Sequence, residues 1–296
     1  MTRLVCPTAF KGTFSPLQAA RRLARPGDSI LPLSDGGDGF LECLHAGLGG
    51  SWREARAEDP FGRARAVPWL ELPDGTACVE CAKVVGLAGL EVLDPLRASS
   101  RGLGQLLAQL EGAPSLWIGL GGSATVDGGR DWPPLRLPPT RAFCDVRTRL
   151  EDAARIFGPQ KGARPEDIPL LEARLLGLGL PSGPRTGAAG GLGARLAILG
   201  AGLEDGAEAM LEVLHFDARL GGCTEVLTGE GRLDASSLEG KLPVAVARRA
   251  RSLGVRVLGH FGSRGEGWED AASEFDHVSF GLEPLPTDRG GGAAGE

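Results

Sequence analysis

The chain contains 296 residues, of which 42% are hydrophobic, and its formal net charge at pH 7 is −6. This hydrophobic content excludes a largely disordered chain, and the length predicts about two domains. The acidic balance disfavours nucleic acid as a partner, and no apolar run approaches the ~18 residues of a membrane span. Because the N-terminal apolar run at 4–7 is too short for a signal-peptide core, we expect a cytoplasmic protein with reduced cysteines.

Lysine is rare in this sequence, with four lysines against 28 arginines. A lysine that persists in such a sequence can supply what arginine cannot, namely a compact point charge for a phosphate in a tight loop. Three of the four adjoin glycine: Lys11, Lys161 and Lys241. This pattern favours a phosphate-binding role for these three, although chance explains so small a set equally well.

The N-terminal region predicts strands that alternate with helices. A strand at 4–6 is followed by a helix that starts at Ser15-Pro16, and a second strand at 29–33 leads into a helix after position 39. This alternation is typical of a parallel sheet. Between the second strand and its helix, Asp35 and Asp38 stand among glycines, where they could bind Mg²⁺ or a substrate hydroxyl. The alternative is an aspartate-capped turn.

The next region is rich in predicted strands, at 52–57, 64–72 and 76–81, with a hairpin-turn signal at 73–75. Cys78 and Cys81 form a single C-x-x-C pair in this region. Because residues three apart in a strand point to opposite faces, these cysteines are predicted to pack in the core and not to bind zinc.

A predicted helix at 102–110 and a buried strand at 115–120 lead into a glycine-rich turn at 119–129. The amides of Gly121, Gly122 and Ser123 are predicted to converge on a phosphate or carboxylate, and Asp127 could hold a metal. The same turn fits a dinucleotide fingerprint, which is weak alone. A tight turn capped by Asp127 is the alternative.

Three segments between 131 and 199 are rich in proline or glycine. A proline-rich crossing without regular structure is predicted at 131–140, and Lys161 follows in a glycine-flanked loop at 157–162. The run at 186–193 precedes a predicted helix at 190–199, so Gly190 and Gly191 could bind an anion at a helix N-terminus or could allow close helix packing.

The C-terminal region predicts another strand, helix and strand at 225–227, 243–252 and 255–261. After the first strand, Glu230, Arg232 and Asp234 alternate with glycines, and Lys241 follows. This mixture of charges suits phosphoryl transfer, in which catalysis is mostly positioning and charge neutralisation. A surface loop with local ion pairs is the alternative. The tail at 288–296 is predicted to be disordered.

In this order, the motifs resemble those of the bacterial glycerate kinase family. The motifs are PTAFKGT at 7–13, LSDGGDGF at 33–40, DPFGR at 59–63, VEC and GLAGL between 79 and 90, SSRGLGQLL at 99–107, GLGGSATVDGG at 119–129, CDV at 144–146, FGPQKGA at 157–163, GAAGGLGA at 187–194 and LTGEGRLDASSLEGK at 227–241. The resemblance implies ATP-dependent phosphorylation of D-glycerate, usually at the 2-hydroxyl. It also implies a fold of two α/β domains with the active site in the cleft between them.

One of these domains is expected to be Rossmann-like with a parallel sheet, and the other to be a mixed α/β insertion. We assign 1–50, 95–130 and 220–287 to the Rossmann-like domain, and 51–94 and 131–219 to the insertion. Substrate and nucleotide are the expected partners, without nucleic acid or membrane, and the resemblance leaves the oligomeric state open.

The resemblance, together with residue type and placement, assigns a role to each candidate. The expected catalytic residues are Lys11, Asp35, Asp127, Lys161, Asp234 and Lys241. Among them, Lys11, Lys161 or Lys241 neutralises the phosphoryl charge, Asp35 or Asp127 orients or deprotonates the hydroxyl, and Asp234 is a further candidate for a metal contact. The expected sites for ATP are Gly121, Gly122, Ser123, Gly190 and Gly191. The expected substrate ligands are Ser99, Ser100 and Arg232, the last of which suits a carboxylate. The expected contacts to Mg²⁺ are Asp145 and Glu230, partly through water.

The sequence also departs from the family pattern. Thr8 and Ala9 stand where the family has Asp-Ser, and the chain is shortened near 130–142 and 176–186. These departures leave open a degenerate member that binds a small acid or nucleotide without turnover. A nicotinamide-dependent oxidoreductase is disfavoured, because no acidic residue lies ~20 positions beyond the glycine fingerprint.

Overall fold

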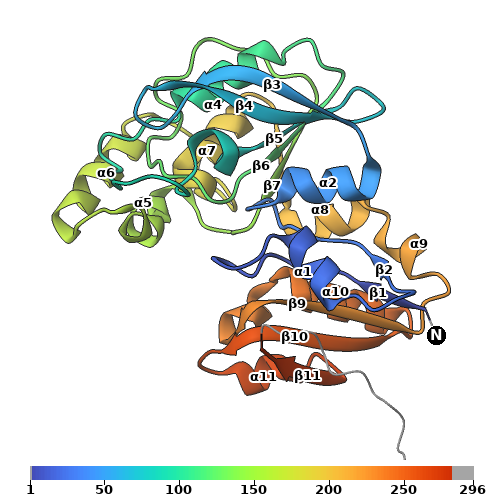
Figure 1. Cartoon of the computed structure of the whole chain (residues 1–296). Coiled ribbons are helices and arrows are strands. Elements are labelled where there is room, and N and C mark those ends of the chain that lie inside the picture. Colours follow the sequence, from blue (N-terminus) through green and yellow to red (C-terminus); the bar gives the residue numbers. More distant parts are fainter. Residues whose placement is uncertain (1, 282–296) are drawn as a thin grey trace, which may run out of the picture.

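The computed structural model describes residues 2–281, which form two β-sheets with helices around and between them (Figure 1). The α/β class expected from the alternating pattern is confirmed. Within the described residues, no helix combines the length and apolar character that crossing a membrane requires.

The first sheet is entirely parallel and has the strand order β11-β10-β9-β1-β2. Its strands are β1 (Arg3–Val5), β2 (Ser29–Ile30), β9 (Glu225–Leu233), β10 (Arg256–Arg264) and β11 (His277–Phe280). The chain passes outward from β1 to β2 in one direction, and from β9 to β10 and β11 in the other. The sheet therefore has a topological switch point between β1 and β9, which is where open parallel sheets bind their ligands.

The second sheet is mixed and has the order β3-β4-β5-β6-β7-β8. Its strands are β3 (Ser51–Glu58), β4 (Ala64–Glu71), β5 (Ala77–Glu80), β6 (Leu116–Gly119), β7 (Thr140–Cys144) and β8 (Gly202–Asp205). The first three strands pair antiparallel, and β5 to β8 pair parallel. As a result, the loops after β6 and β7 emerge at one edge of this sheet.

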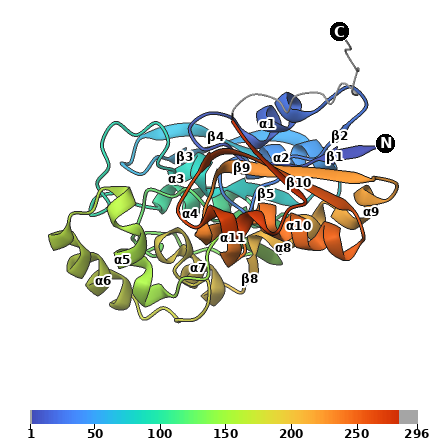
Figure 2. The same ribbon diagram turned by 90° about the horizontal axis from the view of Figure 1, so that it is seen from below.

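Helices accompany both sheets. Those in the first 130 residues are α1 (Pro16–Leu23), α2 (Phe40–Leu48), α3 (Cys81–Val85) and α4 (Arg101–Gln109). The later ones are α5 (Ala153–Phe157), α6 (Ile168–Leu176), α7 (Ala188–Ile198), α8 (Gly206–Val213), α9 (Phe216–Leu220), α10 (Leu242–Ser252) and α11 (Trp268–Ala272). Short 3₁₀ helices occur at Leu150–Asp152, Pro159–Lys161, Pro165–Asp167 and Ala235–Glu239. In both views α5 and α6 lie at one end of the molecule, away from β1 and β2 (Figure 2).

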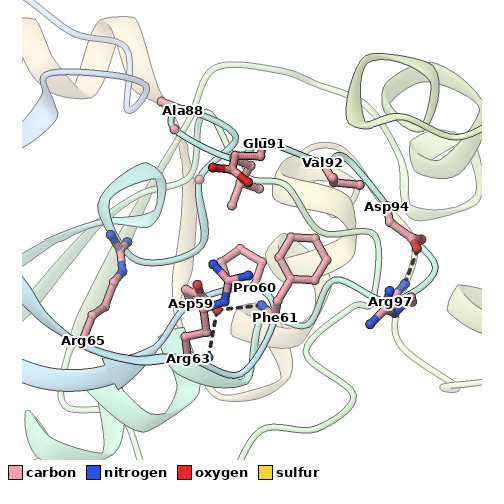
Figure 3. Close-up of a pocket in the computed structure, with 13 residues that line it drawn as sticks. Asp59, Pro60, Phe61, Arg63, Arg65, Ala88, Glu91, Val92, Asp94 and Arg97 are labelled. Atoms are coloured by element: carbon pink, nitrogen blue, oxygen red, sulfur yellow. Dashed lines mark hydrogen bonds between the residues drawn. The ribbon is translucent and has the colours of Figure 1, made fainter.

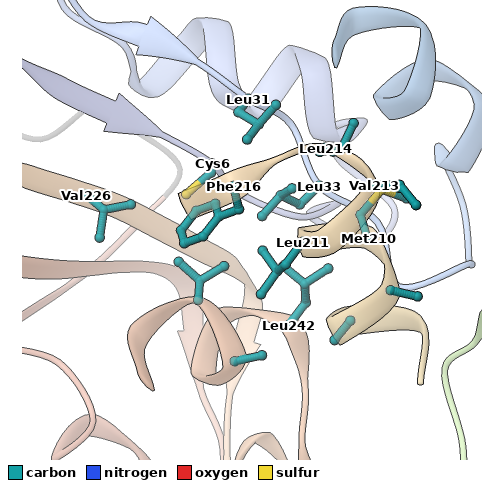
Figure 4. Packing of buried hydrophobic residues seen from close by; sticks show 14 of the residues in the cluster. Cys6, Leu31, Leu33, Met210, Leu211, Val213, Leu214, Phe216, Val226 and Leu242 are labelled. Atoms are coloured by element: carbon teal, nitrogen blue, oxygen red, sulfur yellow. The ribbon is translucent and has the colours of Figure 1, made fainter. Parts of the chain in front are cut away.

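The helices α2 and α8 form a layer between the two sheets (Figure 1). Helix α2 contacts β4 and β5, while α8 contacts β7 on one side and α10 on the other. One hydrophobic cluster runs through this layer, and Figure 4 shows the part around Phe216, Met210 and Leu214. The same cluster includes Phe143 and Leu70 of the mixed sheet. The two sheets are therefore joined by a common core.

Several predicted elements are confirmed. Helix α1 begins at Pro16 with Ser15 as its N-cap, and Ser15 and Gln18 form a complete capping box. The predicted strands between 51 and 81 correspond to β3, β4 and β5, and the crossing at 131–139 has no regular structure. Cys78 and Cys81 are buried in two different hydrophobic clusters, as predicted, although Cys81 begins α3 and does not lie in the strand.

Other predictions are wrong. Residues 95–130 were expected in the domain of the parallel sheet, but β6 pairs with β5 and β7 in the mixed sheet. The error arises because a buried parallel strand carries the same apolar pattern in either sheet. The segment 228–233 was expected to be a loop, but it continues β9, in which glycine and charged residues are tolerated because β9 extends beyond its neighbour β1. The predicted tail at 288–296 lies outside the described residues.

Candidate active site

A cavity of about 590 Å³ lies where the loops of the two sheets meet. The parallel sheet contributes the loop after β1 with Lys11, the loop after β2 with Asp35, and Glu230 on β9. The mixed sheet contributes Gly122 after β6 and Asp145 after β7. The cavity therefore lies at the carboxyl ends of strands from both sheets, next to the switch point between β1 and β9.

The loop after β2 is packed directly against the glycine-rich turn after β6. The backbone N–H of Gly121 donates to the carbonyl oxygen of Gly36 across 2.8 Å. Gly36 has a φ of +99°, and a Cβ at this position would lie 2.3 Å from the carbonyl oxygen of Phe143. Since no side chain fits at Gly36, glycine is required for this contact.

A carboxylate that the sequence analysis did not single out fixes the same loop. Glu80 at the end of β5 is only 1% exposed, and it accepts hydrogen bonds from the N–H groups of Gly39 (3.3 Å) and Leu41 (3.1 Å). These donors lie at the N-terminus of α2, where the helix leaves N–H groups unpaired. The motif VEC at 79–81 was noted only as part of a resemblance, because burial of a charged residue cannot be recognised from sequence alone.

Three carboxylates of the cavity influence one another. Burial raises the pKa of Asp145 to about 7, and the nearby negative charge of Asp35 adds to the shift. Asp145 is exposed on the cavity side, but the protein around its carboxylate disfavours the charged form. Burial also raises the pKa of Glu230 to about 7, again with a contribution from Asp35. Asp35 is thus the common neighbour of two carboxylates that hold protons more tightly than usual.

Lysines balance part of this negative charge. Lys11 lines the cavity and favours the ionised form of Asp145. The Nζ atom of Lys241 lies 3.4 Å from Oδ1 of Asp234, and the Nε atom of Arg232 lies 3.5 Å from Oδ2 of the same carboxylate. Although burial opposes it, hydrogen bonding from Ser236 and the charge of Lys241 hold the pKa of Asp234 below its usual value.

Lys161 lies behind the glycine-rich turn, on a smaller cavity of about 50 Å³ that shares Gly122 and Asp145 with the large one. It is 3% exposed, and its Nζ donates to Oγ of Ser123 (2.8 Å) and to the carbonyl oxygen of Thr125 (2.7 Å). Burial lowers the pKa of Lys161 to about 8. The predicted grouping of Lys161 with the turn is therefore present, and its ammonium group holds the turn in place.

Asp127, Ser99 and Ser100 do not line either of these cavities. The buried carboxylate of Asp127 accepts hydrogen bonds from the N–H (2.7 Å) and the hydroxyl (3.0 Å) of Ser100. Trp132 in turn donates its indole N–H to Ser100. Asp127 thus fixes the start of α4, which agrees with the alternative of a capping aspartate and not with a catalytic or metal-binding one.

Gly190 and Gly191 also lie apart from the large cavity. Both have positive φ angles, and a Cβ on Gly190 would lie 2.0 Å from the carbonyl oxygen of Thr125. They interrupt the helical backbone within the first turn of α7 and allow this part of the chain to pack against the back of the glycine-rich turn. Close packing, which the sequence left as an alternative to anion binding, is therefore what the structure favours.

The donor set of the cavity is compatible with a magnesium ion. Within residues 2–281, no group of three histidine, cysteine or acidic side chains is already arranged as a metal site. Magnesium keeps several waters and needs only one or two protein carboxylates, so this finding does not conflict with it. Burial, with a smaller contribution from the charge of Asp35, raises the pKa values of Asp145 and Glu230, and a bound cation would favour their ionised forms.

Comparisons with known proteins agree with this geometry. A family model described as the glycerate kinase family matches residues 3–131 and 135–287. The chain is 33% identical to the glycerate 2-kinase of Escherichia coli K12, covering 89% of this chain and 85% of that protein. It is 31% identical to the glycerate kinase of Halalkalibacterium halodurans over 345 aligned positions, covering 96% and 91%. That alignment is longer than this chain, so the relative carries segments that this chain lacks.

The fold also has a relative of known structure. A crystal structure designated glycerate kinase 2, from Salmonella typhimurium LT2, superposes with a TM-score of 0.77 and 28% sequence identity. The match covers 97% of this chain and 92% of that one. The similarity therefore extends over both sheets and is not limited to a nucleotide-binding half.

Proposed function

The chain belongs to the glycerate kinase family and is a kinase, and on that basis we propose that it transfers the γ-phosphoryl group of ATP to the 2-hydroxyl of D-glycerate. The observation that supports this most directly is the cavity at the carboxyl ends of both sheets. It combines Asp35, whose charge acts on both Asp145 and Glu230, with Lys11, Lys241 and Arg232. This is the combination that phosphoryl transfer needs, in which positioning and charge neutralisation dominate.

In the proposed reaction, the 2-hydroxyl oxygen forms a bond to the γ-phosphorus while the bond from that phosphorus to the β,γ-bridging oxygen breaks. The products are 2-phosphoglycerate and ADP. Asp35 accepts the proton of the hydroxyl, because no hydrogen bond or ion pair within the described residues occupies its carboxylate. Lys11 and Lys241, which both line the cavity, neutralise charge on the moving phosphoryl group.

Asp145 and Glu230 are the residues that would hold Mg²⁺, partly through water, and the bound ion would neutralise phosphate charge. Arg232 suits the carboxylate of glycerate, since its side chain is 61% exposed and, within residues 2–281, its only ion pair is the contact of Nε with Asp234. We assign Lys161 and Asp127 to positioning, because their polar atoms are already bonded within the protein.

The two domains follow from the same proposal. We propose that the parallel sheet and the mixed sheet are the cores of the two domains, with the reaction in the cavity between them. Residues 51–205 then form one continuous insertion in the domain of the parallel sheet.

The proposed function is tested by incubating the protein with ATP, Mg²⁺ and D-glycerate, and following the products by ³¹P NMR. Formation of 2-phosphoglycerate that depends on glycerate is the expected result. Formation of 3-phosphoglycerate would overturn the proposed position of transfer but not the kinase activity. Failure to form either product, while ATP or glycerate still raises the melting temperature, would instead favour the degenerate binder.

A further inference from the structure

A second cavity, of about 450 Å³, lies beside the candidate active site but is separate from it. It is formed by the loop between β3 and β4 at 59–63, by Arg65 on β4 and by the segment 86–97 (Figure 3). None of its lining residues lines the active-site cavity. The function proposed above does not use it.

Three arginines line the cavity, and the side chains of two of them form no ion pair or hydrogen bond within the described residues. The side chains of Arg63 and Arg97 make no ion pair or hydrogen bond within residues 2–281. Arg65 donates to the carbonyl oxygens of Lys83 and Val84, which fixes its direction. In Figure 3 the ring of Phe61 stands inside the cavity, with Arg63 and Arg65 toward one end and Arg97 toward the other.

The acidic residues of the same cavity are mostly engaged by the backbone. Oδ1 of Asp59 accepts hydrogen bonds from the N–H groups of Phe61 (2.8 Å) and Arg63 (2.9 Å). Oδ1 of Asp94 likewise accepts from Leu96 (3.1 Å) and Arg97 (3.2 Å). Each aspartate therefore fixes the backbone that carries an arginine, and neither neutralises a guanidinium by an ion pair.

The wall formed by 86–97 is held by the glycine-rich turn on its other side. The N–H of Leu87 donates to the carbonyl oxygen of Gly122 (3.0 Å), and the N–H of Ala124 donates to that of Val85 (2.8 Å). Farther along, Leu93 packs so closely on Gly162 that a Cβ there would lie 2.6 Å from the Leu93 carbonyl oxygen. The cavity is thus preformed, which lowers the entropy cost of binding.

From these observations we propose that the cavity lined by Arg63, Arg65 and Arg97 binds a phosphorylated small molecule. Guanidinium groups bind phosphate in a bidentate manner, and those of Arg63 and Arg97 have no partner among residues 2–281. The half-buried ring of Phe61, which lines the cavity, provides an apolar surface for the remainder of the ligand. The ligand that carries the phosphate group is either a nucleotide or a phosphorylated carboxylic acid, and the experiment below distinguishes these two ligands.

The test is isothermal titration calorimetry on the full chain with AMP, 2-phosphoglycerate and inorganic phosphate as probes. The background is Lys11→Ala, which weakens phosphate binding in the active-site cavity. Adding Arg63→Ala and Arg97→Ala is expected to weaken the remaining binding by about tenfold to a hundredfold. The corresponding pair Arg63→Lys and Arg97→Lys keeps the charge without the planar fork and is expected to bind with intermediate affinity.

The matched control is Arg136→Ala, which removes an exposed arginine that lines neither cavity. It should leave probe binding unchanged. Tighter binding of AMP than of 2-phosphoglycerate identifies a nucleotide ligand, and the reverse order identifies a phosphorylated acid. Equal binding with and without Arg63 and Arg97, or loss of all binding in Lys11→Ala alone, would overturn the proposal. Because the measurement is binding and not turnover, its result is independent of the proposed kinase reaction.

Discussion

The backbone N–H of Gly121 and the carbonyl oxygen of Gly36 form a 2.8 Å hydrogen bond that joins the two halves of the candidate active site. One residue follows a strand of the mixed sheet, and the other follows a strand of the parallel sheet. The contact is tight on both sides, since a Cβ on Gly121 would lie 2.3 Å from the Cα of Gly37. Asp35 and Gly122 thus reach the same cavity through a direct contact between backbones.

The first prediction concerns Gly36→Ala, with Gly27→Ala as the matched control. Both glycines have positive φ angles, +99° and +91°, but only Gly36 has neighbours within 4 Å of an added Cβ. Gly27→Ala should cost about 1 kcal/mol of unfolding free energy, from backbone strain alone. Gly36→Ala should cost at least ~3 kcal/mol and reduce kcat, because the loop must move away from Phe143. Urea unfolding and steady-state kinetics measure both effects, and equal losses in the two variants would contradict the account.

Asp35→Asn should lower kcat at least ~100-fold, because the proposed proton acceptor is lost. The same change removes a negative charge next to Asp145 and Glu230, so the pKa of each of these carboxyls should fall. The control is Asp38→Asn, which changes a second aspartate of the same loop and cavity. We expect kcat to decrease less in Asp38→Asn than in Asp35→Asn. A pH profile of both variants tests the prediction, and a normal kcat in Asp35→Asn would remove this residue as the base.

Magnesium should compete with protons at Asp145 and Glu230, whose pKa values are raised to about 7. For a carboxyl whose folded-state pKa lies above its unfolded value, the folded state binds more protons between the two values. Without a metal, stability should therefore fall as the pH rises from about 4 to about 7. Added Mg²⁺ should raise the melting temperature more at pH 8 than at pH 5, as measured by calorimetry. An effect of Mg²⁺ that does not vary with pH would exclude these carboxylates as its ligands.

Lys161→Met tests the buried ammonium group. The pKa of Lys161 is lowered to about 8 from an ordinary value of 10.5, so the unfolded state binds more protons between these values. In this range the lysine makes the wild-type protein more stable as the pH rises, and Lys161→Met should lack that increase. The measurement is the difference in unfolding free energy between the two proteins from pH 7 to pH 10. Because both proteins contain the same buried cysteines, the titration of those thiols cancels in this difference and that of Lys161 remains. A constant difference would mean that Lys161 titrates normally.

Sequence reasoning located most of the candidate site because its motifs follow strands. Lys11, Asp35, Asp145 and Glu230 all line one cavity, which the rule for carboxyl ends of parallel strands anticipates. The prediction assigned β6 to the parallel sheet, whereas it pairs with β5 in the mixed sheet. The apolar pattern of a buried strand does not indicate which sheet the strand joins. That choice depends on pairing between distant segments.

The remaining errors concern polar residues whose partners are distant in sequence. Asp127 was expected in the reaction, but Ser100, which lies 27 positions away, occupies its carboxylate. Glu80 was passed over, although its buried carboxylate fixes the start of α2. Composition and spacing identify residues that can bind a ligand, but they do not show which of these the fold itself engages.

The core that passes through α2 and α8 has a consequence for how this chain unfolds. Met210 and Leu214 belong to the same cluster as Phe143 of one sheet and Val226 of the other. A fragment limited to the mixed sheet would expose this cluster to water, and so would a fragment limited to the parallel sheet. The two halves should therefore melt in one cooperative transition and not as two separate units.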